Sequence, residues 1–190
     1  IGRRPVLLIS LLGASAAFVA TALSFSLYTF IAARAFAGLF AGSIATAQAY
    51  VADVTTPAER TKYMGLVGAS IGMGFVFGPW IGAELSRFGF GTAAFVSAGL
   101  AFLNFVLALV LLRESLPPEL RGQARLRMRT GFSFARLRAA LGQPVVGQVL
   151  SAGFLTMFAF VAMETTFSLL GFRKFGLNLQ QLGRTFGALV

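Results

Sequence analysis

The sequence predicts an all-α polytopic membrane protein. Of its 190 residues, 57% are hydrophobic and 12% are charged, and the mean hydropathy is +0.81. A soluble protein cannot cover its surface with so few polar side chains. The apolar residues also form runs of about 20, the length that a helix needs to cross a hydrocarbon core about 30 Å thick.

Five full spans and the start of a sixth follow from this length rule. The expected bounds are residues 5–23, 27–51, 57–84, 93–112 and 144–170, with a truncated sixth span beginning near residue 178. Thr56, Pro57 and Glu59 predict a capping box that starts the third span. Thr92 is expected to cap the fourth span, and Asn178 the sixth.

The third span contains an unusual glycine pattern. Gly74, Gly78 and Gly82 recur every fourth residue, which in a helix places them on one face where a neighbouring backbone can approach closely. Pro79 cannot donate a hydrogen bond to the carbonyl of Phe75. We therefore expect a kinked helix that is tightly packed between partners.

The charged residues exclude several functions and predict an orientation. The basic residues lie between apolar runs rather than in a patch with interleaved aromatic residues, so nucleic acid is not an expected partner. With no Cys or His, a thiolate metal site and a His-based triad are not expected. Eleven Lys and Arg residues flank the spans on one side and four on the other, which predicts that the chain start and the linker at 113–143 are cytoplasmic.

Four motifs in chain order resemble the major facilitator superfamily, and most of all its drug:proton antiporters and tetracycline-efflux-like members. They are Ile1-Gly2-Arg3-Arg4-Pro5, similar to the end of the loop between helices two and three; Arg34 with Gly38 in helix four; Gly65, Gly74, Gly78, Pro79 and Gly82, similar to the antiporter motif of helix five; and Leu112-Arg113-Glu114-Ser115-Leu116-Pro117, similar to the exit of helix six. Ala83 stands where the antiporter motif ends in Gly, and Ala37 where many members carry a polar residue.

The resemblance implies a major facilitator-type fold of two six-helix bundles, of which this chain is an internal part. Residues 1–112 would be the remainder of the N-terminal bundle, with spans three to six. Residues 113–143 would be a basic cytoplasmic linker, and residues 144–190 would hold span seven and the beginning of span eight. The partners implied are the lipid bilayer, protons, a small-molecule substrate and the missing remainder of the same chain.

Two sets of candidate residues depend on this resemblance. The first is a conformational latch made of Gly2, Arg3, Arg4 and Asp53, in which Arg3 pairs with Asp53; the alternative is a solvated terminal Asp53. The second set would line the substrate and proton pathway. It includes Arg34, because an arginine within an apolar span is energetically costly unless it faces a polar cavity. Gln48 is expected on the same helical face, and the alternative is a structural arginine bonded to carbonyl groups.

Glu164 is the acidic residue that lies clearly within a span, and it shares a helical face with Met157 and Phe160. A carboxyl group in a span can carry a proton or bind a cation. The alternative is a structural hydrogen bond between helices. Phenylalanine residues beside Glu164 are candidates for an aromatic drug pocket.

The expected function is secondary active transport by alternating access, with proton-coupled efflux of small amphipathic or drug-like molecules. The proton gradient would supply the energy, and no cofactor or enzyme activity is expected. The alternatives are a metabolite or sugar uniporter or symporter of the same fold, and a non-transporting scaffold or receptor. The expected location is a bacterial inner membrane or a plasma membrane.

Overall fold

The computed structural model describes residues 2–115, 138–139 and 141–189. The helices with named bounds are α1 (Arg3–Ala22), α2 (Leu27–Leu39), α3 (Ser43–Val54), α4 (Pro57–Leu85), α5 (Phe90–Leu111), α8 (Pro144–Phe175) and α9 (Leu179–Leu189), with a short 3₁₀ helix, η1, at Ser86–Phe88. Five helical segments in this part of the chain are long and apolar enough to cross a membrane. Most of the expected linker lies outside the described residues.

The second span differs from the sequence-based prediction, because it is broken rather than continuous. Helix α2 ends at Leu39, and α3 begins at Ser43 after a turn. The ring of Phe40 lies against α1, where it occupies the space that a Cβ at Gly13 would need. The break therefore coincides with a contact in which a glycine of α1 accommodates an aromatic side chain.

The helix starts show which capping predictions are correct. Asn178 and Gln181 form a reciprocal pair at the start of α9, where the Asn178 side chain accepts a hydrogen bond from the Gln181 amide at 2.8 Å. Thr56 is the N-cap residue of α4, as expected, but its hydroxyl donates to the Glu59 carboxylate at 2.8 Å and the capping box does not form. Helix α5 begins at Phe90, three residues before the expected start.

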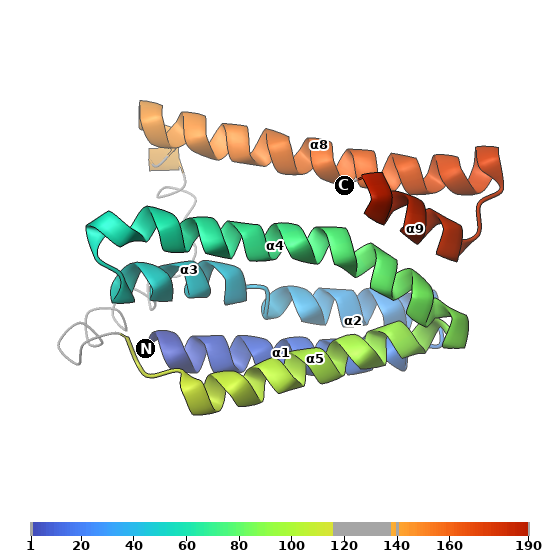
Figure 1. The fold of residues 1–190 in the computed structure, drawn as a ribbon, viewed down its shortest axis with the longest axis horizontal. Helices are drawn as coiled ribbons and strands as arrows, with labels where there is room; N and C mark the ends of the chain where they lie inside the picture. Colours follow the sequence, from blue (N-terminus) through green and yellow to red (C-terminus); the bar gives the residue numbers. More distant parts are fainter. Residues whose placement is uncertain (1, 116–137, 140, 190) are drawn as a thin grey trace.

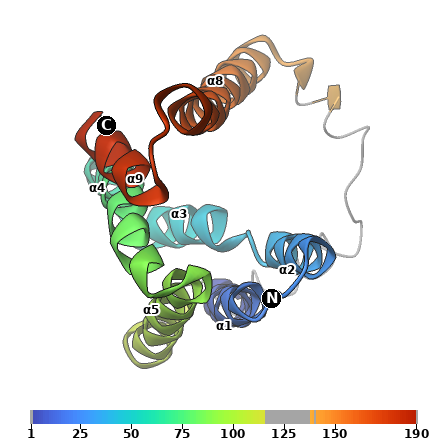
Figure 2. The ribbon, with the colours of Figure 1, turned by 90° about the vertical axis from the view of Figure 1, so that its right-hand side faces the viewer.

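Helix α1 packs along α5, and Figure 2 shows the two helices side by side. The buried positions between them carry small side chains, among them Ala17, Ala98 and Ala108. Ser15 donates a hydrogen bond to the carbonyl oxygen of Ala98 at 3.0 Å. Small residues allow helix backbones to approach closely in a membrane, where apolar burial alone gives no preference for helix over lipid.

Helix α9 links α8 to the bundle formed by α1 to α5. Figures 1 and 2 show α9 beside α4, while most of α8 stands apart from α1, α2 and α5. Helix α8 ends at Gly176, which has a φ of 62° in the left-handed region that glycine adopts readily. This turn allows the chain to fold back so that α9 runs against α4.

Candidate functional site

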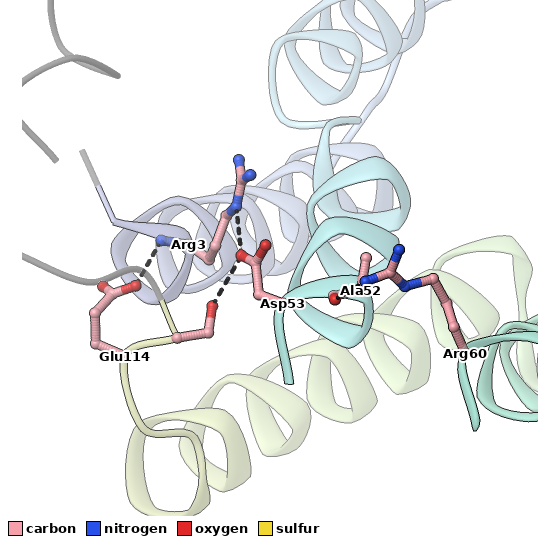
Figure 3. A network of polar contacts seen from close by, with 6 residues as sticks. Arg3, Ala52, Asp53, Arg60 and Glu114 are labelled. Atoms are coloured by element: carbon pink, nitrogen blue, oxygen red, sulfur yellow. Dashed lines mark hydrogen bonds and ion pairs between the residues drawn. The ribbon is translucent and has the colours of Figure 1, made fainter. Parts of the chain in front are cut away.

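The predicted latch residues lie where α1 begins and α3 ends (Figure 3). The Nε of Arg3 lies 3.1 Å from Oδ2 of Asp53, so the expected ion pair is present. Ser115, which follows α5, donates a hydrogen bond to the same oxygen at 3.3 Å. The backbone N–H of Arg3 donates to Oε1 of Glu114 at 2.8 Å. One polar network therefore joins three segments that are distant in the sequence.

The other two predicted latch residues, Gly2 and Arg4, contact residues at the end of α5 and just after it. Gly2 lies against Glu114, whose carboxylate occupies the space that a Cβ at residue 2 would need. Arg4 turns toward α5 and donates to the carbonyl oxygen of Leu109 at 2.8 Å, so it does not join Asp53. Glu114 and Ser115 are additional members that the sequence pattern did not assign to the latch. Their position in the motif that follows α5 is the signal that could have found them.

Arg34 lies on α2 and turns toward α1. Its Nη2 donates to the hydroxyl of Thr21 at 2.5 Å, and its guanidinium carbon lies 5.7 Å from the ring centroids of Phe18 and Phe30. The expected common face with Gln48 assumed one continuous helix, and the break between α2 and α3 removes that assumption. Arg34 therefore has a polar partner and two aromatic neighbours, and its role in transport stays a prediction.

Glu164 lines a cavity of about 250 Å³ between α4, α8 and α9. The walls are Pro79, Gly82 and Ala83 of α4, Glu164 and Ser168 of α8, and Leu182 and Gly183 of α9. Glu164 is half-buried and has no hydrogen-bond or ion-pair partner among the described residues. The sequence indicated an acid in a span but not its position opposite the Pro79 segment, because that position depends on the packing of α9.

The two residues predicted to share a helical face with Glu164, Phe160 and Met157, differ in their contacts. Phe160, one helical turn before Glu164, contacts Phe75 of α4 edge-to-face with ring centroids 5.0 Å apart. Met157 is 57% exposed. The structure therefore brings Phe160 and Glu164 to the α4 side of α8, and it leaves Met157 outside this contact.

The glycine pattern of α4 is not closely packed within the described part of the chain. Apart from the nearby backbone of α4 itself, no atom of the described residues lies within 4 Å of a Cβ built at Gly65, Gly74, Gly78 or Gly82. The close contact involves Gly183 of α9, where an added Cβ would overlap Ala83 and lie 2.7 Å from the carbonyl oxygen of Pro79. Figure 1 shows that α4 bends in its C-terminal part, which contains Pro79, in agreement with the expected kink.

Comparisons with known proteins agree with this architecture. The family model of the Major Facilitator Superfamily matches residues 1–190. The chain is 33% identical over 176 residues to multidrug resistance protein 2 of Bacillus subtilis (strain 168), covering 92% of this chain and 44% of that protein. It is 29% identical over 202 residues to major facilitator superfamily domain-containing protein 10 of Bos taurus, covering 98% of this chain and 44% of that protein.

A solved structure shows the same fold. The crystal structure of the human organic anion transporter MFSD10 (TETRAN) matches with a TM-score of 0.71 at 25% sequence identity, over 99% of this chain and 47% of that chain. The chain thus spans less than half the length of the relatives that it matches in this comparison and the two above. The described helices are part of a major facilitator-type bundle, and the chain belongs to the major facilitator superfamily, a family of membrane transporters rather than enzymes.

Proposed function

We propose that the protein containing this chain is a secondary active transporter that exports small amphipathic or drug-like molecules in exchange for protons. Among the relatives, multidrug resistance protein 2 of Bacillus subtilis and the tetracycline resistance protein, class B, of Escherichia coli carry names that refer to resistance. The chain start and the linker face the cytoplasm in this proposal, and the membrane is a bacterial inner membrane or a plasma membrane. Residues 1–112 belong to one moving body and residues 144–190 to the other.

The observation that carries the proposal is the position of Glu164. A carboxyl group in a membrane-spanning segment is costly, and it is usually retained for proton or ion movement. Glu164 lines a cavity between α4, on the side of the chain assigned to the first body, and α8 and α9 of the second. Rocking of the two bodies would change the access of this carboxyl group to each side of the membrane.

The test is transport by the full-length protein in proteoliposomes with an imposed pH gradient. Glu164→Gln keeps the size of the side chain but removes the ionisable carboxyl group, so we expect loss of the acceleration by the pH gradient. Ser168→Ala, which changes another residue of the same cavity wall, is the matched control and keeps that acceleration. Equal acceleration in Glu164→Gln would assign the proton coupling to another group. Absence of acceleration in the unmodified protein would favour a uniporter, or a symporter driven by another ion, and no flux in the unmodified protein would favour a scaffold or receptor.

A second substrate class is favoured by Arg34. The matching solved structure is that of a human organic anion transporter, and Arg34 places a guanidinium beside two aromatic rings within a span. A cation in such a position can bind an anionic group of a substrate. Measuring whether added organic cations or added organic anions inhibit transport distinguishes the two substrate classes. Export of cations would be inhibited by Glu164→Gln, whereas export of anions would be inhibited by Arg34→Gln.

A further inference from the structure

Glu84, at the C-terminal end of α4, pairs with two arginine residues. Its Oε2 lies 2.7 Å from Nη2 of Arg87, three residues later in η1. Its Oε1 lies 2.5 Å from Nη2 of Arg184 and also accepts from Nε of the same side chain. The two arginines have different origins: Arg87 follows α4 directly, whereas Arg184 lies 100 residues from Glu84 and belongs to α9.

The ion pairs of Glu84 lie at the end of the helix bundle opposite the network around Asp53. Figure 1 shows that α4 begins beside the end of α3 at one end of the bundle and finishes at the other end. Asp53 lies in the last turn of α3 and Glu84 in the last turn of α4. Next to the ion pairs, Gly183 lies so close to Ala83 and Pro79 that an added Cβ would overlap Ala83. The Arg184 pair therefore closes the edge of a helix contact that already excludes larger side chains.

We propose that Glu84 and Arg184 form an ionic lock that holds this end closed, and that Arg87 weakens the lock. The inference rests on the proposed alternating access, in which α4 and α9 belong to bodies that separate at this end. Neither the sequence pattern nor the family comparison assigns a role to these three residues.

The two arginines have opposite effects because Arg184 moves with α9, whereas Arg87 stays beside Glu84. When α9 leaves α4, Arg184 leaves Glu84, so the pair stabilises the closed arrangement. Arg87 stays beside Glu84 in both arrangements and neutralises the carboxylate after Arg184 has left. Arg87 also repels Arg184 in the closed arrangement, because both guanidinium groups carry a positive charge. Removing Arg87 should therefore strengthen the lock, although it removes an ion pair.

The side chains of Arg87 and Arg184 are 48% and 56% exposed, and that of Glu84 is 26% exposed. Exposed ion pairs of this kind have small effects because water screens them. We expect Arg184→Ala to raise the ratio of open to closed molecules by about 1.5- to 5-fold, and Arg87→Ala to lower it by a similar factor. A lock of this strength biases the exchange between states without preventing it.

The experiment measures distances in the full-length protein by pulsed electron paramagnetic resonance. Spin labels are attached at Phe25→Cys and Phe175→Cys, two exposed positions outside the ion pairs, after any cysteines elsewhere in the full chain have been replaced. The variants are Arg184→Ala, Arg87→Ala and Glu84→Gln. Arg173→Ala is the matched control, because Arg173 is an exposed basic residue at the same end with no ion-pair partner among the described residues.

The lock is supported if Arg184→Ala and Glu84→Gln increase the fraction of molecules at the longer distance and Arg87→Ala decreases it. The effect of Arg87→Ala should be smaller when Glu84→Gln is already present, because only its repulsion of Arg184 then remains. The lock is overturned if two distances occur but Arg184→Ala changes their ratio no more than Arg173→Ala does. The role of Arg87 is overturned if Arg87→Ala shifts the ratio in the same direction as Arg184→Ala. A single distance that no variant changes would overturn both the lock and the proposed alternating access.

Discussion

Gly183→Ala tests whether the contact between α4 and α9 controls opening at the Glu84 end. The added Cβ would overlap the Cβ of Ala83 and lie 2.7 Å from the carbonyl oxygen of Pro79. Ordinary contacts between non-bonded heavy atoms are about 3.5–4.0 Å long, so α9 must move away from α4 by about 1 Å. Overpacking of this kind costs about 1–3 kcal/mol. Because this cost falls only on the closed arrangement, the ratio of open to closed molecules should rise about 5- to 150-fold.

The assay is again a distance measurement between the two bodies of the full-length protein, combined with the rate of transport in proteoliposomes. Gly78→Ala is the matched control, because its added Cβ meets no described atom within 4 Å. Both substitutions raise the helix propensity by the same amount, about 1 kcal/mol, so that effect cancels in the comparison. The contact at Gly183 does not control opening if Gly78→Ala opens the protein as much as Gly183→Ala, or if Gly183→Ala leaves the distances unchanged.

Three further substitutions test separate contacts. Asp53→Asn removes the charge that faces Arg3, and we expect a change of less than about 1 kcal/mol in the free energy of unfolding but a clear change in transport rate, measured by thermal unfolding and by flux. Thr21→Val removes the hydroxyl that accepts from Arg34, and it should lower the stability in detergent by about 1.5–3 kcal/mol, the usual worth of a hydrogen bond to a charged group. Asn178→Ala removes the cap of α9, and it should increase hydrogen exchange in the first turn of that helix by the equivalent of about 0.5–2 kcal/mol.

Each of these substitutions has a control in the same chain. Ser115→Ala removes one hydrogen bond to Asp53 but leaves the ion pair, so it should change transport less. Thr46→Val removes a hydroxyl that, among the described residues, bonds to the carbonyl group of Gly42, the N-cap residue of the same helix. Gln180→Ala alters a neighbour of Asn178 that makes no side-chain hydrogen bond among the described residues. Equal effects of a substitution and its control would contradict the role assigned to that contact.

The spans could be predicted from the sequence because their cause is local. A run of about 20 apolar residues must form a helix in a bilayer, since its backbone polar groups have no other partners there. The predicted start of the third span at Pro57 and the cap at Asn178 also depend on residues within one turn of the helix start. The ion pair between Arg3 and Asp53 could be predicted from a resemblance to a family that uses such a pair.

The features that were missed depend on contacts between distant residues. The break after Leu39 coincides with the packing of Phe40 against Gly13. Gly38 and Gly42 lie beside the break, but glycine alone does not reveal it, because α4 contains several glycines and stays continuous. The glycine spacing of α4 predicted a close contact at Gly74, Gly78 and Gly82, whereas the structure places the contact at Gly183, on the partner helix. Spacing defines a helical face but does not define which element covers that face.

The length of α8 has a consequence for the choice of membrane. At about 1.5 Å per residue, its 32 residues extend for about 48 Å, which exceeds the hydrocarbon core by about 18 Å. Arg173 and Lys174 give the last turn a positive charge that can reach the lipid headgroups. The excess length must be accommodated by tilt or by protrusion, and each has a cost that decreases as the bilayer becomes thicker. Bilayer thickness, set by acyl-chain length in a reconstituted system, is therefore a variable that acts on α8 and, through the turn at Gly176, on α9.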